Sequence, residues 1–498
     1  MDELNNYYIK TNRTFTIVRK YAWIFTFMVA IGGLWEPRLG VLVIGIMSGL
    51  IGTSFFSGRH WCGNFCPHGS LFDNIINPIS LNKKIPLFLK SKWFIGAFFL
   101  FFTINFSRKL FRIAALWGTY SFIERLGYIF VNTYLMVLVV GGAVALLVNS
   151  RTWCQFCPMG TLQKLSYRLG KTVGVVKHTE KRITIESKDK CHTCGKCARV
   201  CPFQLTPYLE FNENNQFDNI NCIKCTTCVE NCPANLLSLE TERKAVNIIQ
   251  MSDVKGYENR QEIESTLMEI NDLGGDLKEF VFRFENPTKV HYKAGQFILV
   301  KIQDNPVQYR AYSISSANED DKILKIIIKR VKNGYGTEII FRFNVGDKVI
   351  LEGPMGNHLV PGEDTKKMLF IANGIGITPF IGLAKESLSK GSSVESVKLL
   401  NGQRYVADFI YHDYFKELQK EYDNFEYLPA ASREEQEQED LYKGYVTGLL
   451  KEIDITGHKV YMCGSGAMIK ECYEILLSKG TPSEDIFFES EERIKLSA

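Results

Sequence analysis

The 498-residue sequence predicts a multidomain protein: an α-helical membrane bundle of about four spans, a small cysteine-rich domain, an antiparallel β-barrel and an α/β domain. Three observations support this prediction. Long apolar runs lie in the first third, and two cysteine runs of identical spacing follow them. The remainder changes from short strands to strands that alternate with helices. We expect domain boundaries at 1–170, 171–245, 246–365 and 366–498.

The charge distribution separates the first third from the rest of the chain. Residues 1–160 contain 15 Lys and Arg but 5 Asp and Glu, and they hold all six tryptophans. Basic flanks and clustered Trp beside apolar runs are typical of a protein in a lipid bilayer. This composition argues against a nucleic-acid partner.

Four apolar stretches are candidate membrane spans. The second and fourth are long enough to cross a bilayer, whereas the first and third need flanking residues. A further apolar stretch, residues 110–123, carries Arg112 and either lies in the interface or extends the third span. The four stretches are Ala22–Trp35, Leu39–Ser57, Trp93–Ser107 and Leu126–Ser150.

Basic residues indicate the orientation of these spans. The N-terminal tail, the loop 58–92 and the segment from Arg151 are basic, and four spans place all three on one side. The positive-inside rule makes that side cytoplasmic. A second basic group argues against this topology, since Arg108, Lys109, Arg112 and Arg125 would then lie outside. We expect a multi-pass protein of the cell inner (cytoplasmic) membrane with its soluble domains in the cytoplasm.

Two cysteine runs between residues 191 and 233 share the spacing C-x2-C-x2-C-x3-C-P. This is the spacing of bacterial 2[4Fe-4S] ferredoxins, in which the fourth cysteine of each run ligates the other cluster. Zinc sites and a disulfide framework fit this spacing less well. We therefore expect one [4Fe-4S] cluster on Cys191, Cys194, Cys197 and Cys232, and a second on Cys222, Cys225, Cys228 and Cys201.

Two shorter cysteine pairs follow the second and fourth apolar stretches. They stand in RHWCGNFCPHG and RTWCQFCPMG, whose similarity indicates an internal duplication. Four thiolates from the two halves would suit one iron–sulfur cluster or a smaller iron site at the membrane surface. Structural or disulfide-forming pairs are the alternative. The four residues are Cys62, Cys66, Cys154 and Cys157.

The paired Cys-Pro motifs, the four spans and the ferredoxin segment resemble the membrane-bound polyferredoxin family over residues 15–235. That family includes the membrane subunit of periplasmic nitrate reductase systems and the nitrous-oxide regulator type. The resemblance implies electron exchange between the iron–sulfur chain and a quinone pool or a membrane redox partner. This sequence has two residues between Cys154 and Cys157, where family members often have three, which leaves the cluster type open.

The last 250 residues begin with short strands that suit a small antiparallel barrel. From residue 368 a buried strand precedes the glycine-rich segment NGIGITP, and strands then alternate with helices. That order predicts a parallel sheet with its ligand at the carboxyl ends of the strands. The expected strands are 262–270, 279–284, 296–302, 311–315, 323–331, 368–372, 397–400 and 460–462.

Four motifs in this part resemble, in order, those of the ferredoxin-NADP reductase family. The resemblance implies an FAD-binding barrel, in which Tyr312 packs on the flavin ring, Ser313 bonds near its reactive edge and Arg310 neutralises a flavin phosphate. A second segment, Gly334, Gly336 and Thr337 in GYGT, would cradle the pyrophosphate with backbone amides.

The same resemblance implies an NAD(P)-binding domain. Its nucleotide loop would contain Gly374, Gly376, Thr378 and Pro379, and the late motif Cys463-Gly464 would place Cys463 beside the nicotinamide. With Ser313, Cys463 is the expected catalytic residue, because hydride transfer needs positioning and no general base. Arg404 and Arg433 are candidates for contacting a 2′-phosphate, so NADH and NADPH both stay open, with NADH preferred.

These parts placed in series predict a membrane-bound NAD(P)H dehydrogenase. A nicotinamide gives up two electrons together and a cluster takes one, so a flavin has to stand between them. Electrons would pass from NAD(P)H through FAD and two [4Fe-4S] clusters to the membrane cysteines and on to quinone. The alternatives are a conduit to a transmembrane or extracytoplasmic partner, and a redox regulatory or maturation factor. The terminal acceptor, the direction of flow and the partner subunits stay open.

Overall fold

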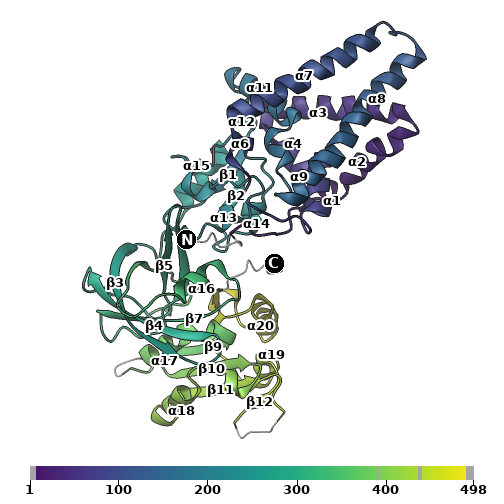
Figure 1. Ribbon diagram of the computed structural model, residues 1–498. Coiled ribbons are helices and arrows are strands. Elements are labelled where there is room, and N and C mark those ends of the chain that lie inside the picture. The colour runs from purple at the N-terminus through teal and green to yellow at the C-terminus, as the bar shows by residue number, and fades with distance from the viewer. Residues whose placement is uncertain (1–6, 390–392, 436–439, 490–498) are drawn as a thin grey trace. The chain divides into compact units, whose positions relative to one another are not determined.

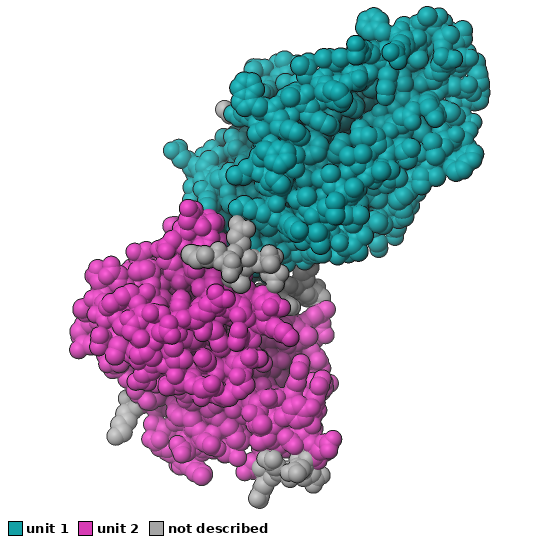
Figure 2. Space-filling view, in the orientation of Figure 1, with its two compact units in different colours: residues 1–188, 195–252 teal, residues 189–194, 253–498 magenta. Residues whose placement is uncertain are grey.

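The computed structural model describes residues 7–389, 393–435 and 440–489. The chain divides into two compact units (Figure 2). Unit 1 comprises residues 1–188 and 195–252, and unit 2 comprises residues 189–194 and 253–498. The short segment 189–194, which carries two of the ferredoxin cysteines, therefore belongs with the barrel and the α/β domain.

The first part of unit 1 is a bundle of apolar helices, in which α2 (Trp23–Ala30), α3 (Leu42–Ser57), α7 (Lys92–Ala114) and α8 (Tyr120–Met136) run side by side (Figure 1). Four helical segments of the described chain are long and apolar enough to cross a membrane. Helix α7 continues through Arg112 to Ala114, so the apolar stretch 110–123 is split between the end of α7 and the start of α8. The four candidate spans are Ile17–Leu34, Pro37–Ser57, Lys92–Ala114 and Tyr120–Leu147.

The cysteine pairs lie at the starts of helices at one end of this bundle. Cys66 and Cys157 stand at the N-caps of α5 (Pro67–Leu71) and α11 (Pro158–Thr172), each with proline at the first helical position. Proline suits this position because its fixed φ matches a helix and its missing N–H would have no helical partner there. The other helices here are α1 (Ile17–Tyr21), α4 (His60–Asn64), α6 (Leu87–Lys90), α9 (Gly142–Leu147), α10 (Trp153–Phe156) and α12 (Val176–Thr179).

The ferredoxin part of unit 1 is closed by an antiparallel pair, β1 (Lys181–Ile185) and β2 (Leu237–Thr241). Helices α13 (Lys196–Arg199) and α14 (Thr227–Glu230) start within the two cysteine runs. Both runs use left-handed backbone at matching places, Gly195 (φ 66°) and Thr226 (φ 56°), so the duplication extends to the loop conformation. Helix α15 (Glu242–Met251) lies across the boundary predicted at residues 245–246.

Six antiparallel strands of unit 2 form the barrel, in the order β6-β5-β8-β3-β4-β7. An isolated bridge between Ile314 and Ile326 joins the two ends of that order. Strand β6 begins earlier than predicted because β5 turns back tightly at Asn305-Pro306. The elements are β3 (Gln261–Asp272), β4 (Leu277–Asn286), β5 (Phe297–Asp304), β6 (Val307–Ser313), β7 (Ile323–Lys329), α16 (Tyr335–Ile340) and β8 (Lys348–Met355).

The remaining strands form a parallel sheet in the order β12-β11-β10-β9-β13-β14. The strand order reverses between β9 and β13, so their carboxyl ends flank a topological switch point, where ligands of open α/β sheets bind. Apolar side chains pack on both faces of the sheet. The elements are β9 (Lys367–Asn373), α17 (Thr378–Ser387), β10 (Ser396–Gln403), α18 (His412–Glu421), β11 (Phe425–Ala431), β12 (Tyr442–Lys443), α19 (Val446–Glu452), β13 (Lys459–Cys463), α20 (Gly466–Ser478) and β14 (Ile486–Glu489).

Candidate functional site

The second ferredoxin cluster has its four predicted ligands together in unit 1. Burial is the main cause that raises the pKa of the Cys222 thiol to about 12; a backbone hydrogen bond from Lys224 opposes the rise, and the neighbouring Cys225 and Cys201 contribute to it. Burial is also the main cause that raises the pKa of Cys228, and Cys222, Cys225, Cys197 and Cys201 contribute. Cys201, from the first run, therefore lies among the three cysteines of the second run, as crossed ligation requires.

Of the predicted ligands of the first cluster, Cys191 and Cys194 belong to unit 2, and Cys197 and Cys232 belong to unit 1. Within unit 2, the loop 189–194 is bonded to the barrel. Arg310 donates to the carbonyl oxygen of Cys194 at 2.9 Å, and Arg260 donates to that of Cys191 at 2.9 Å.

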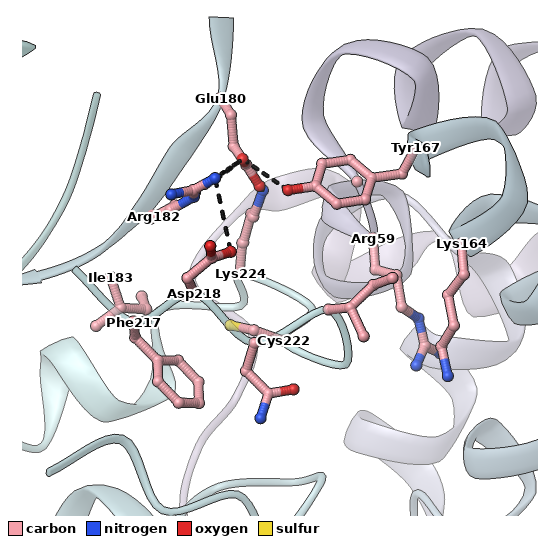
Figure 3. A pocket seen from close by; sticks show the side chains of 13 residues that line it. Arg59, Lys164, Tyr167, Glu180, Arg182, Ile183, Phe217, Asp218, Cys222 and Lys224 are labelled. Atoms are coloured by element: carbon pink, nitrogen blue, oxygen red, sulfur yellow. Dashed lines mark hydrogen bonds and ion pairs between the residues drawn. The ribbon is translucent and has the colours of Figure 1, made fainter. Parts of the chain in front are cut away.

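A charged network anchors the second cysteine loop within unit 1 (Figure 3). The Lys224 ammonium lies 2.5 Å from the Glu180 carboxylate and donates to the carbonyl of Ser57 at 2.8 Å. Glu180 also accepts from Tyr167 and Arg182, at 2.9 Å each. Beside this network and Cys222 lies a cavity of about 10 Å³, roughly the room of one water molecule.

The four membrane cysteines of the duplicated motifs also lie together. Burial is the main cause that raises the pKa of Cys66, and Cys62, Cys154 and Cys157 all contribute. Gln163, which the sequence did not single out, places its Oε1 3.1 Å from the Cys62 sulfur, while its buried Nε2 has no partner. Because amide oxygen and nitrogen positions are assigned and not observed, the opposite orientation would donate to a Cys62 thiolate. These residues fit a thiolate-ligated iron–sulfur group.

Among the described residues, no three His, Cys, Asp or Glu side chains are grouped tightly enough to hold one metal ion. None of the cysteines in that part of the chain forms a disulfide. A four-iron cluster is larger than a single ion and holds its thiolates farther apart. The spacing of the two ferredoxin runs is that of four-iron clusters.

The predicted flavin residues meet where β6 approaches α16. A Cβ at Gly336 would lie 2.7 Å from the Arg310 side chain, so glycine permits this approach. The Arg310 Nη2 is buried and has no hydrogen-bond partner in the structure. Gly334 precedes α16, and Thr337 bonds back to Val331. An unpartnered guanidinium nitrogen beside a helix start fits the phosphate of FAD.

Tyr312 and Ser313 end β6. Ser313 pairs with Phe297 of β5, and Tyr312 packs against the barrel core. Ser313 is half-buried, as a residue that contacts a bound ring should be.

The nucleotide residues converge at the switch point of the parallel sheet. A Cβ at Gly376 would lie 2.2 Å from the Cys463 carbonyl oxygen, so the glycine-rich loop and the Cys463-Gly464 loop touch by backbone. Gly374 has a φ of 58°, and α17 begins at Thr378-Pro379. Arg404 and Arg433 follow β10 and β11, are exposed, and share a backbone hydrogen bond of 2.8 Å.

Glu489 is a candidate that sequence reasoning missed. It pairs with Cys463 across β13 and β14, and its Oε1 would lie 3.5 Å from a Cβ at Gly356. Burial raises the pKa of its carboxyl group to about 7. The only available signal was an acidic residue at the end of an apolar strand.

Comparisons with known proteins agree with this geometry. Residues 264–359 match the oxidoreductase FAD-binding domain and residues 370–474 the oxidoreductase NAD-binding domain. Residues 183–233 match a 4Fe-4S dicluster domain, and residues 39–86 and 131–175 match a 4Fe-4S binding domain. The chain thus matches an oxidoreductase FAD-binding domain and an oxidoreductase NAD-binding domain together with two kinds of 4Fe-4S domain.

Individual relatives cover part of the chain. The phenol hydroxylase P5 protein of Acinetobacter pittii is 29% identical over 46% of this chain and 65% of its own length. The aromatic O-demethylase reductase subunit of an Amycolatopsis species is 28% identical over 42% of this chain and 63% of its own length. The chain therefore spans slightly less than two thirds of each of these relatives.

Among solved structures, the Amycolatopsis cytochrome P450 reductase GcoB aligns over 47% of this chain and 71% of its own, at 24% identity and a TM-score of 0.43. A likeness at that level carries no argument about function.

Proposed function

We propose that this chain is a membrane-bound NAD(P)H dehydrogenase of the polyferredoxin type, held in the inner membrane with its soluble domains on the cytoplasmic side. Electrons would pass from NAD(P)H through FAD and two [4Fe-4S] clusters to an iron–sulfur site at the membrane cysteines, and then to quinone. When bound, FAD supplies the conversion of a two-electron hydride into single electrons.

One contact within unit 1 carries the proposal. Gly63 lies between Cys62 and Cys66, and a Cβ there would meet the Ile223 carbonyl oxygen at 2.0 Å and the Cys225 backbone nitrogen at 3.1 Å. The loop of the membrane cysteines therefore packs directly on the loop of the second ferredoxin cluster. Such backbone contact supports electron passage between the two metal sites.

In unit 2, the protein's part in hydride transfer is positioning. Ser313 and Cys463 would orient the nicotinamide against the flavin, and Arg310 would hold the flavin phosphate. Because Arg310 also bonds the carbonyl of Cys194, the flavin site is linked to the loop that carries two ligands of the first cluster.

His68 is our candidate for contacting the quinone. Its ring lies 4.3 Å from that of Tyr134 in α8, and its buried Nε2 has no hydrogen-bond partner in the structure. Burial lowers its pKa to about 4, so the imidazole is neutral. In the tautomer that carries its proton on Nε2, this nitrogen would donate a hydrogen bond to a quinone oxygen.

The test is anaerobic NADH-driven reduction of a menaquinone analogue by the purified protein in lipid nanodiscs. The variant is Cys62→Ala, and the control is Cys472→Ala, which alters a buried cysteine outside all motifs. We expect Cys62→Ala to reduce its flavin and ferredoxin clusters but not quinone, and the control to behave as wild type. If the flavin and all iron–sulfur centres of the wild-type protein are reduced but the quinone is not, the proposal is refuted. A partner protein would then be the acceptor to test.

A further inference from the structure

Each half of the membrane cysteine motif contains an arginine three residues before its first cysteine, in R-H-W-C and R-T-W-C. The structure gives both arginines the same contact. Arg59 Nη2 lies 3.8 Å from the Cys62 sulfur, and Arg151 Nη1 lies 3.5 Å from the Cys154 sulfur. These are hydrogen-bond distances for sulfur, so the duplication preserves an arginine that donates to a cysteine.

The two halves of the duplicated motif also contact each other, because a glycine of each half packs against the arginine of the other half. Gly69 and Gly160 each stand three residues after the second cysteine of their motif. A Cβ at Gly69 would lie 2.8 Å from Arg151 Nη1, and one at Gly160 would lie 2.9 Å from Arg59 Nη2. Each half therefore makes room for the arginine of the other half.

The other two sulfurs face backbone N–H groups. The Gly69 amide donates to the Cys66 sulfur at 3.4 Å. The backbone amides of Gly160 and Met159 donate hydrogen bonds to the Cys157 sulfur. Every one of the four sulfurs thus has a donor directed at it, which suits thiolates better than neutral thiols.

The buried arginines around the four membrane cysteines favour additional negative charge at these cysteines. The guanidinium groups of Arg13, Arg19, Arg59 and Arg151 are nearly inaccessible to solvent. Asp73 pairs with three of them, Arg13, Arg19 and Arg151. Among the described residues no carboxylate pairs with Arg59. Buried cations without counter-charge are costly, and four metal-bound thiolates would supply the missing negative charge.

We propose that Arg59 and Arg151 are paired positioning residues that donate to two thiolates of an iron–sulfur site at Cys62, Cys66, Cys154 and Cys157 and raise its reduction potential. The inference rests on the proposed function, in which the second ferredoxin cluster is oxidised by one electron as this site is reduced by one. Reduction adds negative charge, which a fixed cation stabilises. Arg59 has the larger effect, because Asp73 offsets much of the charge of Arg151.

The experiment is an EPR-monitored redox titration of the purified full-length protein in lipid nanodiscs, together with iron and sulfide content per chain. The variants are Arg59→Gln, Arg59→Lys and Arg151→Gln. The control is Arg38→Gln, which removes a half-exposed arginine paired with Glu36 and Glu124.

We expect Arg59→Gln to lower the midpoint potential of one centre by at least about 59 mV, which corresponds to a tenfold change in the equilibrium of its one-electron reduction. The two ferredoxin midpoints should stay unchanged. Arg151→Gln should shift the same centre less, and Arg59→Lys should shift it by an intermediate amount.

Full iron content with an unshifted midpoint in Arg59→Gln would overturn the role of the arginines and leave the proposed function standing. If Arg59→Gln loses iron, an unshifted midpoint in Arg59→Lys overturns the role and a shifted midpoint supports it. Wild-type protein with iron for two clusters only would overturn both the metal site and this inference.

Discussion

The carboxyl group of Glu489, which pairs with Cys463 across β13 and β14, gives the stability of unit 2 a dependence on pH. In the folded chain burial raises its pKa to about 7, from an ordinary value of 4.5. Between these two values the unfolded chain releases the proton and the folded chain retains it. The contribution of Glu489 to stability therefore falls as pH rises from about 4.5 to 7 and does not change above that range.

Replacing Glu489 by glutamine should remove this slope. We expect Glu489→Gln to match wild type near pH 5 and to have a higher midpoint of thermal flavin release at pH 8. FAD fluorescence during heating measures this, and Glu484→Gln, at an exposed acid before the same strand, is the control. If the midpoint of flavin release depends on pH in the same way in wild type and in Glu489→Gln, the raised pKa of Glu489 is refuted.

At the scale of elements, the candidate nucleotide site is formed by two loops, one after β9 and one after β13, which are in direct contact. The Asn373 side chain accepts from the Ser465 amide at 2.8 Å and donates to the Ser465 hydroxyl at 3.0 Å. With the close approach at Gly376, these bonds fix the position of Cys463.

A methyl group at Gly376 should separate the loops. We expect Gly376→Ala to raise the KM for NADH and slow flavin reduction roughly 10- to 100-fold, because small displacements at a reacting centre are costly. Stopped-flow flavin bleaching is the measurement. Gly362→Ala, whose Cβ would lie 3.6 Å from Thr365 Oγ1, should behave as wild type. Equal rates in both variants would contradict a role for this contact.

At the scale of the whole molecule, metal sites that are distant in sequence depend on buried ion pairs. Lys224 and Glu180 are 5% and 7% exposed and join the second cysteine loop to β1, while Lys224 also bonds the end of α3 at Ser57. Removing one partner of a buried pair leaves the other charge without compensation.

Lys224→Met should therefore loosen the second cluster. We expect iron release to a chelator to be about tenfold faster than in wild type, a change of about 1.4 kcal/mol. Lys171→Met removes an exposed lysine of the same network and should have little effect. Equal release rates in Lys224→Met and wild type would show that the pair does not hold the loop.

The sequence by itself determined the cysteine spacings, the order of flavin and nucleotide motifs and the four apolar helices, because each depends on local spacing or composition. Tertiary structure alone decided which distant groups meet. It brings Cys201 to the second cysteine run, Gly376 to Cys463, and each arginine to the glycine of the other half. Glu489 and Gln163 escaped prediction because their neighbours come from other elements, and burial and pairing leave no local signature in a sequence.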